Sequence, residues 1–224
     1  KPSDDFLFQA AIYNGSPADP DAEDGQRDNR HGLSFRMEDP PLVMAEAQFG
    51  YVLGLAGKLK VGGWYEFSDF TDKLTDQPVA HNSGVYGVID QALWKAAFGG
   101  AVNFLARVSA APSRQNEISF YADAGLVFTG LMPGRPNDTL GVAAGYGKVS
   151  PRLRDRQIAD TEAVISDYEA VIEVNYSAEI IPGWSIAPDI HYIWNPGGGA
   201  ENPARPGEPI GDAIVAGVRT VIAY

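Results

Sequence analysis

The sequence contains no cysteine, which excludes a disulfide framework and a cysteine-ligated metal site. It has no stretch close to the ~20 consecutive apolar residues that a membrane-spanning helix needs. Basic residues are few, with 17 Lys and Arg against 29 Asp and Glu, and the net charge of -12 argues against nucleic acid as a partner. The chain starts at Lys1 without a signal peptide, as a mature or truncated protein would.

Catalytic signatures are absent as well. There is no GxSxG, Walker or HExxH pattern, and nothing in the sequence places a nucleophile beside a base. With three histidines and no cysteine, we expect no catalytic residues, no metal and no cofactor. The acidic segment at residues 18–25 (ADPDAEDG) is similar to a fragment of a Ca²⁺ loop but lacks the spaced bidentate Glu. A solvated loop is the expectation there, with a weak divalent-cation site as the alternative.

What the sequence does contain is alternation with a period of two, most clearly at residues 167–195. Successive side chains of a strand point to opposite faces, so this period predicts a long β-hairpin with a turn at 181–183. One face is apolar and aromatic, with Tyr168, Ile172 and Val174 on the first strand and Trp184, Ile190 and Trp194 on the second. The other face carries Glu169, Glu173, Asn175, Asp189 and His191.

The length of the second strand favours a membrane. Trp184 and Trp194 are ten residues apart on one face, which corresponds to about 33 Å along a strand. A strand tilted by about 40° would then cover roughly 25 Å of height, close to the apolar band of an outer-membrane barrel with its aromatic girdles. We therefore expect an all-β fold, an antiparallel transmembrane β-barrel with lipid on its apolar side and water on its polar side.

Ten strands are expected along the chain. They are residues 5–14, 42–53, 57–68, 84–95, 101–110, 117–131, 138–148, 167–180, 184–194 and 211–224. The connections alternate in length, with long ones at 14–41, 69–83, 149–166 and 196–210 and short ones at 54–56, 96–100 and 181–183. This alternation is typical of short periplasmic turns and longer outer loops, so both chain ends are expected on the periplasmic side. Within 149–166, a proline at a first-turn position predicts a short loop helix.

Several segments carry a family resemblance, above all DAGLVFTGLMPGRPNDTLGVAAGYGKVS (123–150) and the D-YIWNPGG pattern within 161–198. Together with segments at 12–21, 42–51, 57–70, 84–95 and 212–220, they resemble the carbohydrate-selective porin (OprB-type) family of Gram-negative bacteria. The resemblance covers nearly the whole chain and keeps its order. It implies a single porin barrel domain over residues 1–224, in the bacterial outer membrane, that passes sugars by diffusion.

The resemblance also implies more than this chain holds. Family barrels are expected to have sixteen strands and to form homotrimers, whereas this chain supplies about ten strands and matches only the C-terminal part. An open ten-stranded sheet would leave two unpaired edges in lipid, which is not viable. Three possibilities stay open: the N-terminal strands are absent from this sequence, a second chain supplies them, or a shorter barrel closes by itself. The expected partners are therefore carbohydrate solutes, outer-membrane lipid, further copies of the chain and the missing strands.

Candidate pore-lining residues follow from strand parity, given a sugar channel. The predicted inward set is Glu46, Lys60, Trp64, Glu66, Asp90, Asn103, Arg107, Asp123, Glu173, Asn175, Asp189, His191 and Arg219, with Gln48 and Lys58 beside them. Arg107 and Arg219 are the strongest candidates, because an outward Arg in mid-strand would cost about 2–4 kcal/mol in lipid. The alternative role for each is an ion pair with a neighbouring carboxylate that only keeps the surface polar.

Four residues have competing interpretations. Asp189 and His191 could form a metal or acid/base pair, but a wetted channel surface is the favoured reading. Parity places Trp64 and Trp94 with the polar residues, where they could stack on sugar rings; the alternative for both is an aromatic girdle position at a strand end.

Two other function classes stay open. A soluble β-sandwich lectin would also be all-β and sugar-binding, but with short strands and its apolar face turned inward. A barrel subunit of an outer-membrane enzyme or secretion complex would share the fold without conducting sugars.

Overall fold

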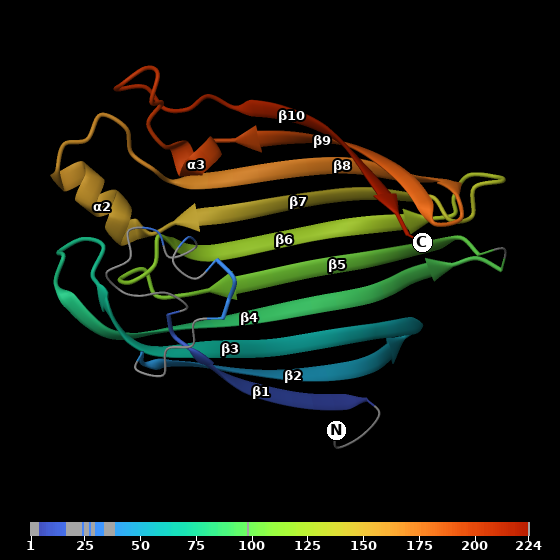
Figure 1. Cartoon of the computed structure of the whole chain (residues 1–224), viewed down its shortest axis with the longest axis horizontal. Coiled ribbons are helices and arrows are strands. Elements are labelled where there is room, and N and C mark those ends of the chain that lie inside the picture. Colours follow the sequence, from blue (N-terminus) through green and yellow to red (C-terminus); the bar gives the residue numbers. More distant parts are fainter. Residues whose placement is uncertain are drawn as a thin grey trace.

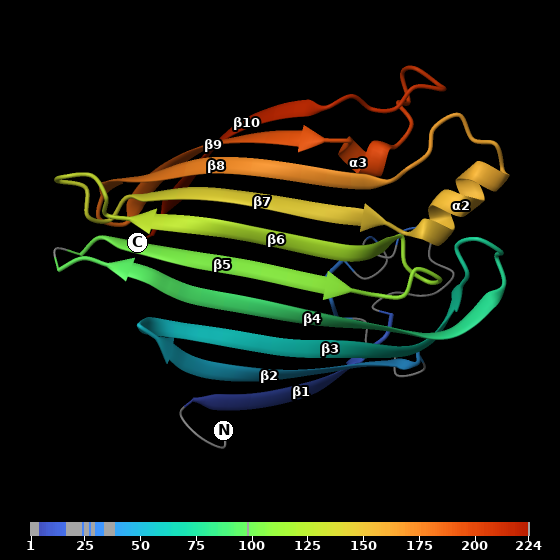
Figure 2. The same ribbon diagram turned by 180° about the vertical axis from the view of Figure 1, so that it is seen from behind.

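The structure, a computed structural model, describes residues 5–16, 24, 27, 30–33, 39–97 and 99–223. Ten strands form one antiparallel sheet, and their order in space is their order in the sequence. The sheet curls into an open trough (Figures 1 and 2). Within the described residues, β1 and β10 are the two edges of the sheet and do not pair with each other.

All ten predicted strands are confirmed; their ends differ from the prediction by at most three residues, except that β4 begins six residues earlier. The strands are β1 (Phe6–Asn14), β2 (Pro41–Leu53), β3 (Leu55–Thr71), β4 (Pro78–Lys95), β5 (Ala101–Ala110), β6 (Ile118–Thr129), β7 (Thr139–Val149), β8 (Tyr168–Ile181), β9 (Trp184–Trp194) and β10 (Ala213–Ile222). The predicted loop helix is α2 (Pro151–Ala159), which has a proline in its first turn, and a short α3 (Pro196–Gly199) follows β9. No helix among the described residues is long and apolar enough to cross a membrane.

The connections alternate between the two ends of the sheet as expected. The connections at 54, 96–100, 130–138 and 182–183 lie at the end where β1 begins and β10 stops. Three of them are short, whereas 130–138 is longer than the 72–77 and 111–117 connections at the opposite end. Gly54 and Gly183 make two of these turns tight by adopting φ values of 72° and 85°, which a residue with a Cβ disfavours. The segment 18–25, where a Ca²⁺-loop fragment was considered, lies outside the described residues except for Asp24.

One predicted loop is wrong. Residues 69–83 were expected to be a long connection, but β3 and β4 continue through most of this range and leave only residues 72–77 as the loop. A register shift between Glu66 and Asp69 interrupts the alternation there, and His81 adopts a positive φ of 65°. The chain is still paired as a ladder beyond that point, although its side-chain pattern no longer looks like a strand.

The sheet has two chemically different faces. We call "polar face" the side that carries Glu46, Arg107, Asp123, Glu173 and Asp189, and "apolar face" the side that carries Phe104, Ala106, Ile172, Val174 and Ile190. Cross-strand partners share a face, so the register connects each set across neighbouring strands. The polar face is the hollow side of the trough, since Tyr86 on β4 reaches over β3 to contact Glu46 on β2.

Within the part of the chain that the structure describes, no second layer covers the apolar face. Among the described residues, only Val79, Val149 and Ala187 are buried apolar side chains, whereas large ones such as Val85, Ile190 and Val218 are exposed. A soluble sandwich would bury this face against a second sheet, and the described residues form one sheet only. A continuous exposed apolar face of this extent is the surface of a protein that contacts lipid.

Candidate functional site

All thirteen residues of the predicted inward set lie on the polar face, whereas Trp94, which parity also placed with the polar residues, does not. The register places the following side chains on it: Glu46, Lys60, Trp64, Glu66, Asp90, Asn103, Arg107, Asp123, Glu173, Asn175, Asp189, His191 and Arg219. They come from eight strands, and the structure brings some of them into three clusters. The rest, including Lys60, Glu66, Asp90, Asn103 and Arg219, lie on the polar face outside those clusters.

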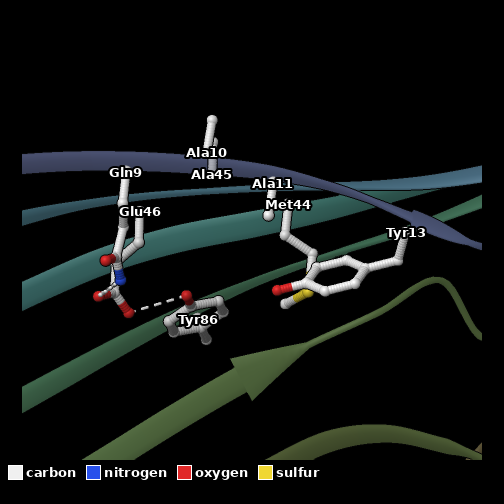
Figure 3. A pocket seen from close by; sticks show the side chains of 8 residues that line it. All are labelled: Gln9, Ala10, Ala11, Tyr13, Met44, Ala45, Glu46 and Tyr86. Carbon is white, nitrogen blue, oxygen red and sulfur yellow. Dashed lines mark hydrogen bonds between the residues drawn. The ribbon is translucent and has the colours of Figure 1, made fainter.

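The first cluster surrounds Glu46 at the middle of β2 (Figure 3). Its carboxylate accepts hydrogen bonds from Gln48 Nε2 at 2.6 Å, from Tyr86 Oη at 2.9 Å and from Gln9 Nε2 at 3.1 Å. Tyr13 and Met44 complete a hollow of about 250 Å³ beside it. The site therefore combines a fixed carboxylate, amide groups and apolar side chains.

The second cluster is an ion pair between directly opposed residues of β5 and β6. Arg107 Nε donates to Asp123 Oδ2 at 2.8 Å, with the Arg107 side chain 56% exposed and that of Asp123 14% exposed. A hollow of about 350 Å³ lies beside Arg107, lined also by Tyr86, Ser109 and Tyr121. The pairing that was considered as the alternative role of Arg107 is thus present.

The third cluster lies on β8 and β9, in the hairpin whose alternation is the clearest in the sequence. His191 Nε2 is 2.9 Å from Asp189 Oδ2, and His191 Nδ1 is 3.6 Å from Glu173 Oε2. Asn175 Nδ2 donates to Glu173 Oε1 at 2.9 Å. Among the described residues, no group of three or more His, Asp or Glu side chains has the geometry to hold a metal ion. The cluster is a chain of polar contacts in which each group has a partner.

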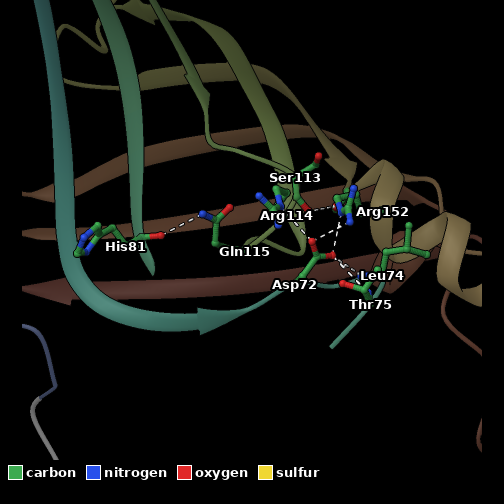
Figure 4. Close-up of polar contacts among 9 residues, drawn as sticks. Asp72, Leu74, Thr75, His81, Ser113, Arg114, Gln115 and Arg152 are labelled. Carbon is green, nitrogen blue, oxygen red and sulfur yellow. Dashed lines mark hydrogen bonds and ion pairs between the residues drawn. The ribbon is translucent and has the colours of Figure 1, made fainter. Parts of the chain in front are cut away.

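A different network joins the connections at the long-loop end, centred on the fully buried Asp72 (Figure 4). Arg152, in α2, donates to it through Nε at 2.8 Å and Nη2 at 2.7 Å, and Arg114 Nε donates at 3.0 Å. The backbone N–H of Leu74 donates as well, at 2.9 Å. Three connections are thereby tied together: 72–77, 111–117 and 150–167. The pKa of Asp72 is far below its ordinary value, chiefly because of the hydrogen bonds from Arg152.

The two sequence motifs form ordered turns at opposite ends of the sheet. In the 130–138 connection, Asp138 accepts hydrogen bonds from Tyr176 Oη, from Arg135 Nε at 2.7 Å and from the Glu179 N–H at 3.0 Å. In the segment after β9, Gly198 packs so closely on Val149 that a Cβ there would lie 2.6 Å from Val149 Cγ2. The central part of each motif therefore holds a turn in place, while Asp123 and Asp189, at the start of the two motifs, lie on the polar face.

Comparison with known proteins decides the family. Residues 1–224 match the profile of the "Carbohydrate-selective porin, OprB family" over their whole length. The chain belongs to this family.

Two individual relatives agree with that assignment. The chain is 28% identical over 190 residues to a protein of Acinetobacter baylyi named "Putative porin QuiX", covering 74% of this chain and 40% of that protein. A solved structure titled "High pH structure of Pseudomonas putida OprB" superposes with a TM-score of 0.81 at 17% identity, covering 99% of this chain and 56% of that one. The chain thus has the fold of a porin barrel and spans about half the length of the relatives it matches.

One predicted side-chain direction in this porin is wrong. Trp94 was placed with the polar residues by parity, but the register shifts between Ala92 and Trp94, so that Trp94 pairs with Val102 on the apolar face. It lies near the end of β4, which is the girdle position considered as its alternative. Trp64 has no such shift before it and lies on the polar face in mid-strand.

The polar face also contains residues that parity reasoning left out of the candidate set. Tyr86 contacts Glu46 and lines both hollows, and Tyr121 lines the second one. Both have the parity of the polar set, so the signal was present, but a tyrosine on a strand reads equally well as a girdle residue. Asp72 carries no comparable signal, because its partners lie 42 and 80 residues away in the sequence.

Proposed function

We propose that this chain forms the larger part of an outer-membrane channel through which small saccharides diffuse passively into a Gram-negative bacterium. The observation that carries the proposal is the division of one sheet into an uncovered apolar face and a polar face with charges of both signs. The family is a channel family and not an enzyme family, and its name states selectivity for carbohydrates.

The polar face suits weak and repeated binding of hydroxyl groups. Its carboxylates, amides and guanidinium groups can each exchange a hydrogen bond with a sugar without forming a covalent bond. Most of the charges in the three clusters already have partners, such as Asp123 for Arg107, so a passing solute competes with existing contacts and leaves again easily. No cofactor or metal is needed for such a process.

The outer edges of β1 and β10, which have no partner strand among the described residues, require partners in a membrane. Unpaired N–H and C=O groups cannot face hydrocarbon, so we propose that further strands pair with these edges and close a barrel of about sixteen strands, the size expected for this family. The chain's own ten strands would form more than half of its wall. A homotrimer of such barrels, with the short connections on the periplasmic side, completes the proposed assembly.

The test is reconstitution of the complete barrel in planar lipid bilayers. We expect stepwise open-channel conductance in KCl that glucose and small oligosaccharides reduce in a concentration-dependent and saturable way. Channels that conduct ions but show no saturable block by any saccharide would contradict the proposal. If the protein never conducts, a subunit of an outer-membrane enzyme or secretion complex becomes the better reading. If the protein stays monodisperse in water without detergent, that result supports the soluble lectin alternative instead.

A further inference from the structure

On the polar face, two aromatic residues of the β3–β4 pair each lie opposite a glycine of the other strand. Tyr86 of β4 is opposite Gly62 of β3, and Trp64 of β3 is opposite Gly84 of β4. A Cβ on Gly62 would lie 2.4 Å from Tyr86 Cζ and Oη, and a Cβ on Gly84 would lie 2.5 Å from Trp64 Nε1. Each ring therefore lies directly over the glycine of the other strand, in the space that a side chain would fill.

Each ring therefore lies against the backbone of the sheet. One side of each ring rests on backbone, and because both residues are only half-buried, the rest is open to the trough. The two positions are two residues apart along the strands, or about 7 Å. Both are in mid-strand, since β3 spans Leu55–Thr71 and β4 spans Pro78–Lys95, so a girdle role at a membrane interface does not account for them.

Polar groups lie on both sides of the two rings. The Tyr86 Oη donates to Glu46, next to the hollow that Gln9 and Tyr13 also line. On the other side, Tyr86 borders the Arg107 hollow. Trp64 borders a third hollow, of about 230 Å³, which is lined also by Ser109, Asn116 and Tyr121. An apolar platform between convergent carboxylate, amide, hydroxyl and guanidinium groups has the composition of a small-molecule binding site.

We propose that Trp64 and Tyr86 form a stacking platform for pyranose rings, with Glu46 and Arg107 on its two sides as hydroxyl partners. A pyranose with equatorial hydroxyls has an apolar C–H face that fits an aromatic ring, and its hydroxyl rim points sideways toward polar groups. An open-chain polyol with the same hydroxyl groups has no such face. This inference deepens the proposed function and rests on it, since it names where along the polar face a saccharide is held.

The platform is tested by sugar-block titrations on the complete barrel in planar bilayers, with glucose as the ring sugar and sorbitol as the open-chain control. Trp64→Ala and Tyr86→Leu should each weaken glucose block about tenfold, as loss of one apolar contact area of ring size predicts, and leave sorbitol block unchanged. Tyr86→Phe keeps the ring and should retain most of the glucose affinity. Trp94→Ala, which removes the same side chain from the apolar face, should bind glucose as the unmodified channel does.

The outcomes separate the platform from the proposed function. Glucose block of wild-type strength in Trp64→Ala and Tyr86→Leu would overturn the platform while leaving the sugar channel intact. An unmodified channel that no saccharide blocks would overturn both. If Trp64→Ala fails to assemble, Gly84→Ala serves instead, because its Cβ displaces the Trp64 indole. A glucose affinity equal to wild type in a correctly assembled Gly84→Ala channel would count against the platform.

Discussion

Arg107 of β5 and Asp123 of β6 are directly opposite in register, and the Arg107 Nε donates to Asp123 Oδ2 at 2.8 Å. The pair lies on the polar face, and its two members differ in exposure, since Arg107 is 56% exposed and Asp123 14% exposed. The guanidinium therefore faces the water of the trough while it holds the carboxylate against the sheet. Removing one member leaves the charge of the other uncompensated at this height.

Ion selectivity is expected to follow from that pair. Arg107→Ala should shift the permeability ratio toward K⁺ by about fivefold, since an uncompensated charge in water acts on a passing ion with about 1 kcal/mol at close range. Asp123→Asn should shift it toward Cl⁻, and the exchange of both residues should restore the original ratio. Reversal potentials in a KCl gradient measure the effect. Unchanged potentials in both single variants would show that the pair lies away from the path of the ions.

We expect the Asp72 network to restrain the connections at the long-loop end and so to suppress flicker in the single-channel current. Asp72→Asn removes the charge that Arg152 and Arg114 share, so the 72–77, 111–117 and 150–167 connections should move independently and produce flicker in single-channel records. Asp155→Asn, an exposed carboxylate on the same helix as Arg152, is the matched control and should stay quiet. If Asp72→Asn shows no more single-channel flicker than Asp155→Asn, the network does not restrain these connections.

The pH dependence of the same network has a definite sign. Hydrogen bonds from Arg152 outweigh burial, which acts in the opposite direction, and depress the pKa of Asp72 in the folded protein. A depressed pKa contributes stability that is complete above the ordinary Asp value of about 3.9 and is lost as pH falls toward the folded value. Single-channel records of the unmodified protein should stay quiet down to about pH 4 and flicker only in stronger acid. Flicker that begins near neutral pH would point to another group.

The 130–138 turn is expected to stabilise the short-connection end. Burial raises the pKa of Asp138, but the hydrogen bonds from Tyr176, Arg135 and the Glu179 N–H lower it more strongly. Asp138→Asn should therefore lower the thermal unfolding temperature by a few degrees at pH 7, with a smaller difference from the unmodified protein as the pH falls below about 3.9. Circular dichroism melts in detergent measure this. A variant that melts like Asp155→Asn would mean that the carboxylate is dispensable there.

The sequence was sufficient for the strands and their faces because both depend on a local period. The hairpin at residues 168–194 shows this best, since its polar set of Glu173, Asn175, Asp189 and His191 lies on one face as the alternation predicts. Alternation predicts the wrong face where one extra residue in a strand shifts its register against the neighbouring strand. The register shift before Trp94 moves its side chain to the other face, and parity has no means to detect it.

Features that depend on distant partners were beyond the sequence. The hydrogen bonds of Asp72 join residues up to 80 positions apart, and the exchange of Trp64 and Tyr86 with Gly84 and Gly62 requires the register of β3 against β4. Glycines in strands read as points of weakness until the ring that covers each one is known. Alternation therefore predicts which side a residue faces, while register decides what it touches.

The division of the sheet into a lipid face and a water face can be measured by single-cysteine labelling, because residues 1–224 contain no cysteine. In the complete barrel in lipid, cysteines at Asn103 and Glu173 should react with a charged, water-soluble thiol reagent and lower the conductance. Cysteines at their chain neighbours Val102 and Ile172 should resist that reagent and react only with a lipid-soluble one. Equal reaction of neighbouring positions with the water-soluble reagent, or protection of Asn103 and Glu173, would show that the sheet does not separate lipid from water in this way.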